Sequence, residues 1–154
     1  MDPLSLAASI AGLAGLVATV VSTTYQYGSG VIGAAASQKS LLGELQSLRS
    51  TLQRLDIVVA EKDASSAKFF SVSEDLGTAI MECQDVINEL YDKLRKKLDA
   101  GKLKGAMHRL TWPLAEADTL KKTEMLARYR GLFHLALGVD TWYLCASLLC
   151  SVSC

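Results

Sequence analysis

The chain has 154 residues, equal numbers of acidic and basic side chains (16 each) and a hydrophobic content of 50%. This length corresponds to one domain, and the apolar content excludes a disordered chain. The lack of a basic excess argues against nucleic-acid binding, so we expect no nucleic-acid partner. Of the four cysteines, three fall in the last ten residues. That distribution fits neither a disulfide framework nor a zinc site, and we therefore expect a reducing, cytoplasmic location.

The first predicted helix, residues 3–23, belongs to a stretch without charge that runs from Pro3 to Gln38. Asp2 suits the N-cap position, and proline suits the first helical position. The predicted helix is about 31 Å long, close to the hydrocarbon thickness of a bilayer. The acidic start argues against a secretory signal. Three alternatives stay open: a central helix of a soluble bundle, a constitutive membrane span, or a helix that is buried at rest and inserts when triggered. The candidate membrane-inserting residues are Leu4, Leu6, Ile10, Leu13, Leu16, Val17, Val20 and Val21.

Two further helices are predicted from apolar residues that recur at alternating spacings of four and three, which is a heptad pattern. The second helix begins near residue 31 or 34 and ends near residue 62. The third begins near residue 72 and ends near residue 98, before a stop at Ala100 and Gly101. Their inward stripes are Leu41, Leu45, Leu48, Leu52, Leu55 and Val59, and then Leu76, Ile80, Cys83, Ile87, Leu90 and Leu94.

A fourth segment is predicted at 103–110, followed by a break at Trp112 and Pro113, because proline disfavours helical geometry in the residue before it. The last helix is predicted from 113 to 137, with Gly138 as its stop. Its expected inward residues are Leu120, Leu126, Tyr129, Phe133 and Leu137. No alternation typical of strands precedes residue 139. We therefore predict an all-α fold, an antiparallel bundle of four to five helices with an apolar N-terminal helix.

The search for catalytic patterns finds no nucleophile motif, no phosphate-binding loop and no dinucleotide fingerprint. The acidic residues stand at spacings that place them on solvated helix faces. His108 and His134 lie in different segments, with nothing beside them in sequence that completes a site. We therefore expect a protein that is not an enzyme, with no catalytic, cofactor-binding or metal-binding residues.

One basic cluster interrupts the even charge distribution: residues 92–109 contain seven basic and two acidic side chains. Two interpretations stay open. Such a cluster can complement the dipole of a helix C-terminus, or it can bind anionic lipid headgroups or an acidic partner. The cluster consists of Lys93, Arg95, Lys96, Lys97, Lys102, Lys104 and Arg109.

Four stretches resemble one family: MDPLSLAASIAGL at 1–13, LLGELQSLRSTL at 41–52, LTWPL at 110–114 and YRGLFHLAL at 129–137. They are similar to the N-terminal domain of fungal STAND (NLR-like) proteins, the HeLo-like group. The same domain heads the azaphilone pigment biosynthesis cluster protein L family. The resemblance covers about residues 1–138.

The resemblance implies a helical signalling module that self-associates or binds other helical signalling domains. In cell-death or incompatibility signalling, such a module inserts its N-terminal helix into membrane, so a cytoplasmic protein becomes membrane-associated on activation. Two alternatives stay open beside it. One is a soluble interaction scaffold whose first helix is simply part of the core, and the other, which rests on analogy with the family, is an accessory protein of a pigment gene cluster.

Residues 139–154 match nothing in that family. We expect them to be an atypical apolar tail, disordered or held on the bundle surface, that arises from truncation or mis-splicing and has no function. The tail is too short to span a bilayer as a helix. Its cysteines, Cys145, Cys150 and Cys154, are candidate palmitate acceptors, although the last is not in a prenylation motif.

Overall fold

The computed structural model describes residues 3–28, 36–61, 69–103 and 112–152, and side chains within 5–27, 36–60, 75–100 and 112–138. These residues form four helices and, in the ranges just given, no strand. The helices are α1 (Pro3–Gly28), α2 (Ala36–Glu61), α3 (Phe69–Leu103) and α4 (Glu116–Val152). The predicted all-α class is confirmed.

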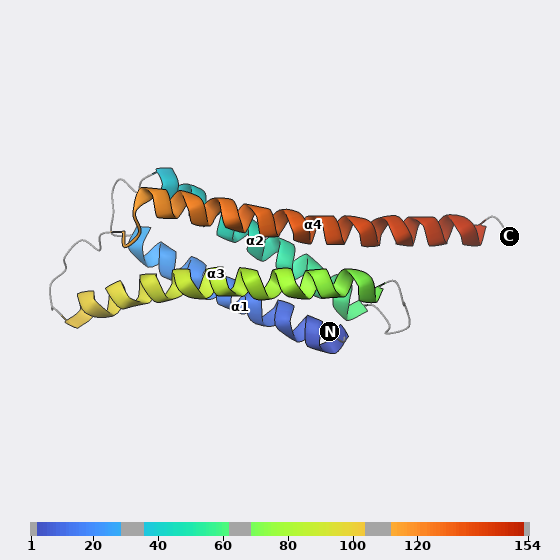
Figure 1. The fold of residues 1–154 in the computed structure, drawn as a ribbon, viewed down its shortest axis with the longest axis horizontal. Helices are drawn as coiled ribbons and strands as arrows, with labels where there is room; N and C mark the ends of the chain where they lie inside the picture. Colours follow the sequence, from blue (N-terminus) through green and yellow to red (C-terminus); the bar gives the residue numbers. More distant parts are fainter. Residues whose placement is uncertain (1–2, 29–35, 62–68, 104–111, 153–154) are drawn as a thin grey trace.

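The helices form a bundle in which α1 and α4 occupy opposite corners. Both α1 and α4 pack against α2 and against α3. Helices α1 and α3 run in one direction and α2 and α4 in the other (Figure 1). Neighbours in sequence, α1 with α2 and α3 with α4, are therefore antiparallel. Since α1 contacts two of the other three described helices, it is a corner helix and does not lie at the centre of the bundle.

The core consists of the predicted heptad stripes. Every residue named for the second and third helices is buried, and so are Leu126 and Phe133 of α4. Each fully buried side chain of this size contributes about 1.5–3 kcal/mol relative to exposure. Heptad spacing places the buried side chains on one face of each helix, and the four apolar faces pack together to form the core of the bundle.

Several predicted boundaries are wrong. Helix α3 continues through Gly101, and α4 begins at Glu116 and continues through Gly138 to Val152. A helical glycine costs about 1 kcal/mol relative to alanine, which a continuing helix can absorb. Leu120, expected to face inward, is 47% exposed. The predicted segment 103–110 lies outside the described residues, except for Leu103, which ends α3.

Helix α4 is longer than the bundle that supports it. It runs on past the other three helices at the end where α1 begins (Figure 1). The expectation of a disordered tail is therefore wrong for the backbone of residues 139–152, which is helical. Its last turns project beyond the bundle and do not lie on the bundle surface (Figure 1).

Candidate functional site

The residues predicted to insert into membrane lie on the inner face of α1. Leu6, Ile10, Leu13, Val17 and Val20 are fully buried, and Val21 is 6% exposed. Leu16 is half-buried, while Leu4 lies in α1 with its side chain outside the described set. In this state the large apolar side chains of α1 are thus core residues. Membrane contact through them requires α1 to leave the bundle.

The outer face of α1 is open to solvent and carries small or hydroxyl-bearing side chains in place of charged ones. Ala8, Ala11, Gly12, Gly15 and Thr19 are all exposed. A Cβ atom added at Gly12 or Gly15 would meet nothing within 4 Å. Packing within the bundle therefore does not explain why glycine occupies these two positions. Both lower the helix propensity of α1 by about 1 kcal/mol each relative to alanine.

Among the described residues, one helix is long and apolar enough to cross a membrane, at Ser5–Tyr27. A buried core helix of a soluble protein or an N-terminal signal sequence would meet the same criterion. What distinguishes α1 from an ordinary amphipathic helix is that its solvent face has no charge at all.

The last turn of α1 is fixed by polar and aromatic contacts. The buried Tyr27 hydroxyl donates to the carbonyl of Leu94 in α3 at 2.5 Å. Its ring meets Trp112 edge-on, with centroids 5.7 Å apart, and Trp112 Nε1 donates to Thr119 Oγ1 at 3.0 Å. Burial raises the pKa of Tyr27. These contacts join the C-terminal end of α1 to both α3 and the start of α4.

Further toward its N-terminus, α1 is held by apolar packing. The hydroxyls of Ser9, Thr19, Thr23 and Thr24 donate to carbonyls of α1 itself, four residues back. Six buried apolar side chains at about 2 kcal/mol each represent about 12 kcal/mol, which is comparable with the whole stability of a typical domain. Release of α1 therefore requires compensating burial elsewhere.

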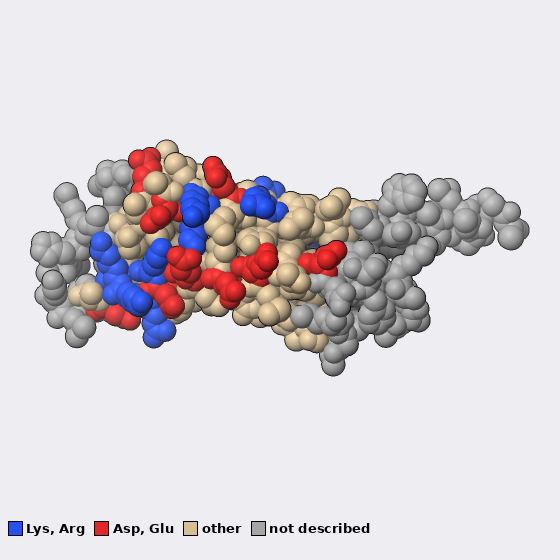
Figure 2. All heavy atoms as spheres, viewed as in Figure 1, with Lys and Arg blue, Asp and Glu red and all other residues tan. Residues whose placement is uncertain are grey.

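The described part of the predicted basic cluster lies at the other end of the bundle, on the last turns of α3. Lys93 pairs with Glu89 at 2.9 Å and Arg95 with Asp99 at 3.6 Å. Arg95 also lies 5.9 Å from the centroid of the Tyr91 ring. Lys96 and Lys97 are exposed. Lys and Arg gather toward this end of the face in Figure 2. The side chain of Lys102, and the whole of Lys104 and Arg109, lie outside the described set.

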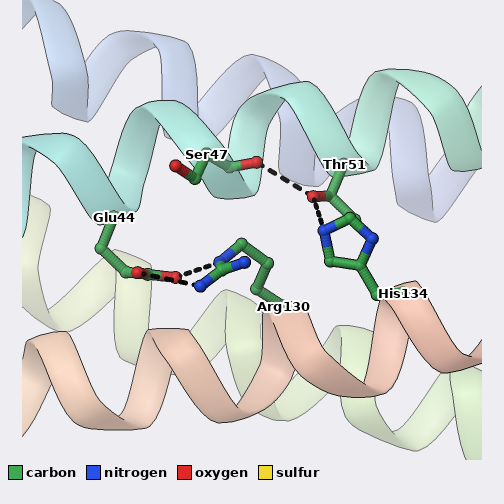
Figure 3. Close-up of polar contacts among 5 residues, drawn as sticks. All are labelled: Glu44, Ser47, Thr51, Arg130 and His134. Atoms are coloured by element: carbon green, nitrogen blue, oxygen red, sulfur yellow. Dashed lines mark hydrogen bonds and ion pairs between the residues drawn. The ribbon is translucent and has the colours of Figure 1, made fainter.

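A polar seam joins α2 to α4 (Figure 3). Arg130 donates through Nε to Glu44 Oε1 at 2.5 Å and through Nη2 to Oε2 at 3.4 Å. His134 Nε2 lies 3.1 Å from Thr51 Oγ1, which donates to the carbonyl of Ser47 at 3.0 Å. A hydroxyl beside an imidazole is one component of a nucleophilic site. Here the hydroxyl proton is committed to a carbonyl and the Glu44 carboxylate to Arg130, so the seam acts as an interhelical clamp.

A second charged contact joins α3 to α4. The ammonium of Lys122, whose side chain is only 10% exposed, donates to Glu89, which also accepts from Lys93. Hydrogen bonding by Lys122, and then by Lys93, lowers the pKa of Glu89 from 4.5 to about 2. Sequence periodicity does not reveal this contact, because the spacing of residues along one helix does not report the rotation of the neighbouring helix.

No group of three or more His, Cys, Asp or Glu suited to a metal ion occurs among the described residues. Cys83 is buried in the core, and burial raises the pKa of its thiol to about 12. His108 lies outside the described residues. The features that remain as candidates for function are thus the uncharged α1, the basic end of α3 and the projecting α4. Comparison of the chain with protein-family models, curated proteins and solved structures gives no match.

Proposed function

We propose that this chain is a non-enzymatic helical signalling module that self-associates and delivers α1 to a membrane. The observation that carries the proposal is the position of α1: an uncharged helix of 26 residues at a corner of the bundle, with one face open to solvent. The resemblance of four stretches to the N-terminal domain of fungal STAND proteins supports the same proposal, and we propose cell-death or incompatibility signalling as its setting.

The energetics of α1 constrain how such a module works. Its inner face is too well buried to open without compensation, whereas a bilayer offers the same side chains an apolar environment. Insertion would therefore move the apolar side chains of α1 from the interior of the bundle to the interior of the bilayer. Since the contacts of Tyr27 hold the C-terminal end of α1, we expect the N-terminal end to leave the bundle first.

A soluble interaction scaffold is the second candidate, favoured by the complete burial of five aliphatic side chains of α1. In that case α1 is a permanent core helix, and its small outer face is a contact surface for another helix. Close approach of helices across Gly and Ala works in water as well as in lipid. The pigment-cluster role has no feature of the structure to support it.

The test is dye release from anionic liposomes by the full chain and by Gly12→Glu. The added side chain has open space in the bundle, so the variant should fold, while a charge on α1 opposes insertion. We expect Gly12→Glu to reduce the rate of release at least tenfold.

The matched control is Gly43→Glu, which adds the same side chain at an exposed, equally open glycine of α2. We expect it to release dye at the unmodified rate. Equal release by Gly12→Glu would overturn insertion by α1. No release by unmodified protein that is folded and helical by circular dichroism would favour the scaffold.

A further inference from the structure

Helix α4 changes character at Gly131. Residues 116–130 contain seven charged side chains, whereas residues 131–152 contain one, Asp140. Two large apolar side chains just after the change are open to solvent: Leu132 is 50% exposed and Leu135 is 65% exposed. The second half of α4 is thus an apolar helix that is only partly covered by its own bundle.

The register of the neighbouring helices shows where α4 leaves the bundle. His134 is level with Thr51 of α2, and the Tyr129 hydroxyl lies 3.4 Å from Glu82 of α3. Counting along the helices, the end of α2 at Glu61 falls near residue 144 of α4, and the start of α3 at Phe69 falls near residue 142. About ten residues therefore project, a length of about 15 Å. Figure 1 shows the same projection.

The projecting part has the length and composition of a shallow membrane anchor. About 15 Å is half of the hydrocarbon core of a bilayer, or one leaflet. The last helical residues, 141–152, carry no charge, and Trp142 and Tyr143 stand where the helix leaves the bundle. Aromatic residues of this kind are enriched at the headgroup level of membranes.

We propose that the projecting end of α4 anchors the bundle in one leaflet of a lipid bilayer, with the bundle standing on the surface. The anchor works through burial of apolar side chains and not through attraction to anionic lipid, because the charges around it are acidic. Residues 56–61 at the end of α2 and residues 69–75 at the start of α3 contain four acidic and no basic side chains, and Asp140 of α4 adds a further acid. Anionic lipid is therefore not what this end attracts, and the basic end of α3 lies at the opposite end of the bundle (Figure 1).

The proposal differs from insertion of α1 in what it requires. Anchoring by α4 leaves the bundle intact and permeabilises nothing, whereas insertion by α1 opens the bundle and releases dye. Because α1 begins at the end where α4 projects, an anchored bundle holds the N-terminus of α1 toward the membrane surface (Figure 1). The two proposals can therefore fail separately.

The experiment is flotation of the full chain with vesicles of phosphatidylcholine alone. We expect binding that changes less than twofold between low and high salt, since screening affects charges and not apolar burial. The double substitution Leu148→Asp and Leu149→Asp should weaken binding at least tenfold. The control Leu120→Asp, at an exposed leucine near the start of α4, should bind like the unmodified chain.

Depth is measured independently through Trp142, with Trp112→Phe as the background. We expect lipids brominated near the headgroup end of the acyl chain to quench Trp142 more than lipids brominated near the bilayer centre. Three outcomes would overturn the anchor. One is no flotation by folded protein. Another is flotation that needs anionic lipid and is lost in Lys96→Gln with Lys97→Gln. The third is a concentration-dependent dimer, without flotation, that the double substitution abolishes, which would make a second copy the partner of this helix.

Discussion

The contact between Glu89 and Lys122 gives the sharpest prediction about stability. The change is Glu89→Gln, which removes the charge that faces the nearly buried ammonium of Lys122. The pKa of Glu89 falls from 4.5 to about 2 in the folded protein, and at face value this fall corresponds to about 3 kcal/mol. The Glu89 side chain is 51% exposed, so solvent screening reduces the contribution to about 1 kcal/mol.

A second effect adds to the first, because Glu89→Gln leaves Lys122 buried without its counter-charge. Loss of one partner from a fully buried pair costs about 3–5 kcal/mol, which is an upper limit for this half-exposed pair. We expect a total loss of about 1–2 kcal/mol in the free energy of unfolding at pH 7. Urea unfolding followed by circular dichroism measures it.

The pH dependence identifies the cause. A carboxyl whose pKa is lowered on folding stabilises the protein above its unfolded pKa, and the contribution disappears as the pH falls through the folded pKa. The difference between the unmodified chain and Glu89→Gln should therefore be constant above about pH 5 and shrink toward pH 2. The additional change Lys122→Met should recover most of the lost stability, because it removes the orphaned charge and keeps the volume. Asp85→Asn, at an exposed residue of the same helix, serves as the control. A loss no larger than that of the control would refute the reasoning.

Three further predictions concern single contacts. Tyr27→Phe removes the hydroxyl that donates to Leu94 and keeps the ring against Trp112; we expect a loss of about 1–2 kcal/mol and faster amide exchange in the last turns of α1, measured by hydrogen exchange. Glu44→Gln should lower the free energy of unfolding by about 1–2 kcal/mol, measured with urea. The Glu44 side chain is only 13% exposed, and its carboxylate accepts hydrogen bonds from Nε and Nη2 of Arg130. In a chain with Cys83 as the sole cysteine, the buried thiol with its raised pKa should resist a thiol reagent at pH 8 and react fully in denaturant.

The bundle could be predicted because the pattern that specifies each buried face lies within a single helix. Heptad spacing within one helix identifies the buried face, so Leu45, Leu52, Ile80 and Leu90 were placed in the core from their intervals alone. The same reasoning placed Leu120 inward and was wrong, since that residue stands near the start of α4, where the inward face is carried by Thr119 and Lys122. A buried lysine on this face is invisible to apolar periodicity.

The ends of helices were harder to predict than their faces. Glycine predicts a helix stop at positions 101 and 138, yet α3 continues through Gly101 and α4 continues through Gly138. At Gly138 an added Cβ would meet nothing within 4 Å, so neither a turn nor a close approach fixes glycine there. Contacts between helices, such as His134 with Thr51, depend on the rotation and register of two elements at once. One sequence does not report those quantities.

The placement of charge along the bundle bears on how the predicted membrane elements can work together. The basic end of α3 and the start of α1 lie at opposite ends of the bundle (Figure 1), so a bundle standing upright on a membrane cannot use both. Docking through Lys96 and Lys97 would place the firmly held last turn of α1 near the lipid, where the contacts of Tyr27 oppose release. Docking through the projecting end of α4 would place the N-terminal turns of α1 there, which are held by apolar packing. Because a bilayer can replace apolar packing but not the hydrogen bond to Leu94, the second orientation has the lower barrier to transfer of α1 into lipid.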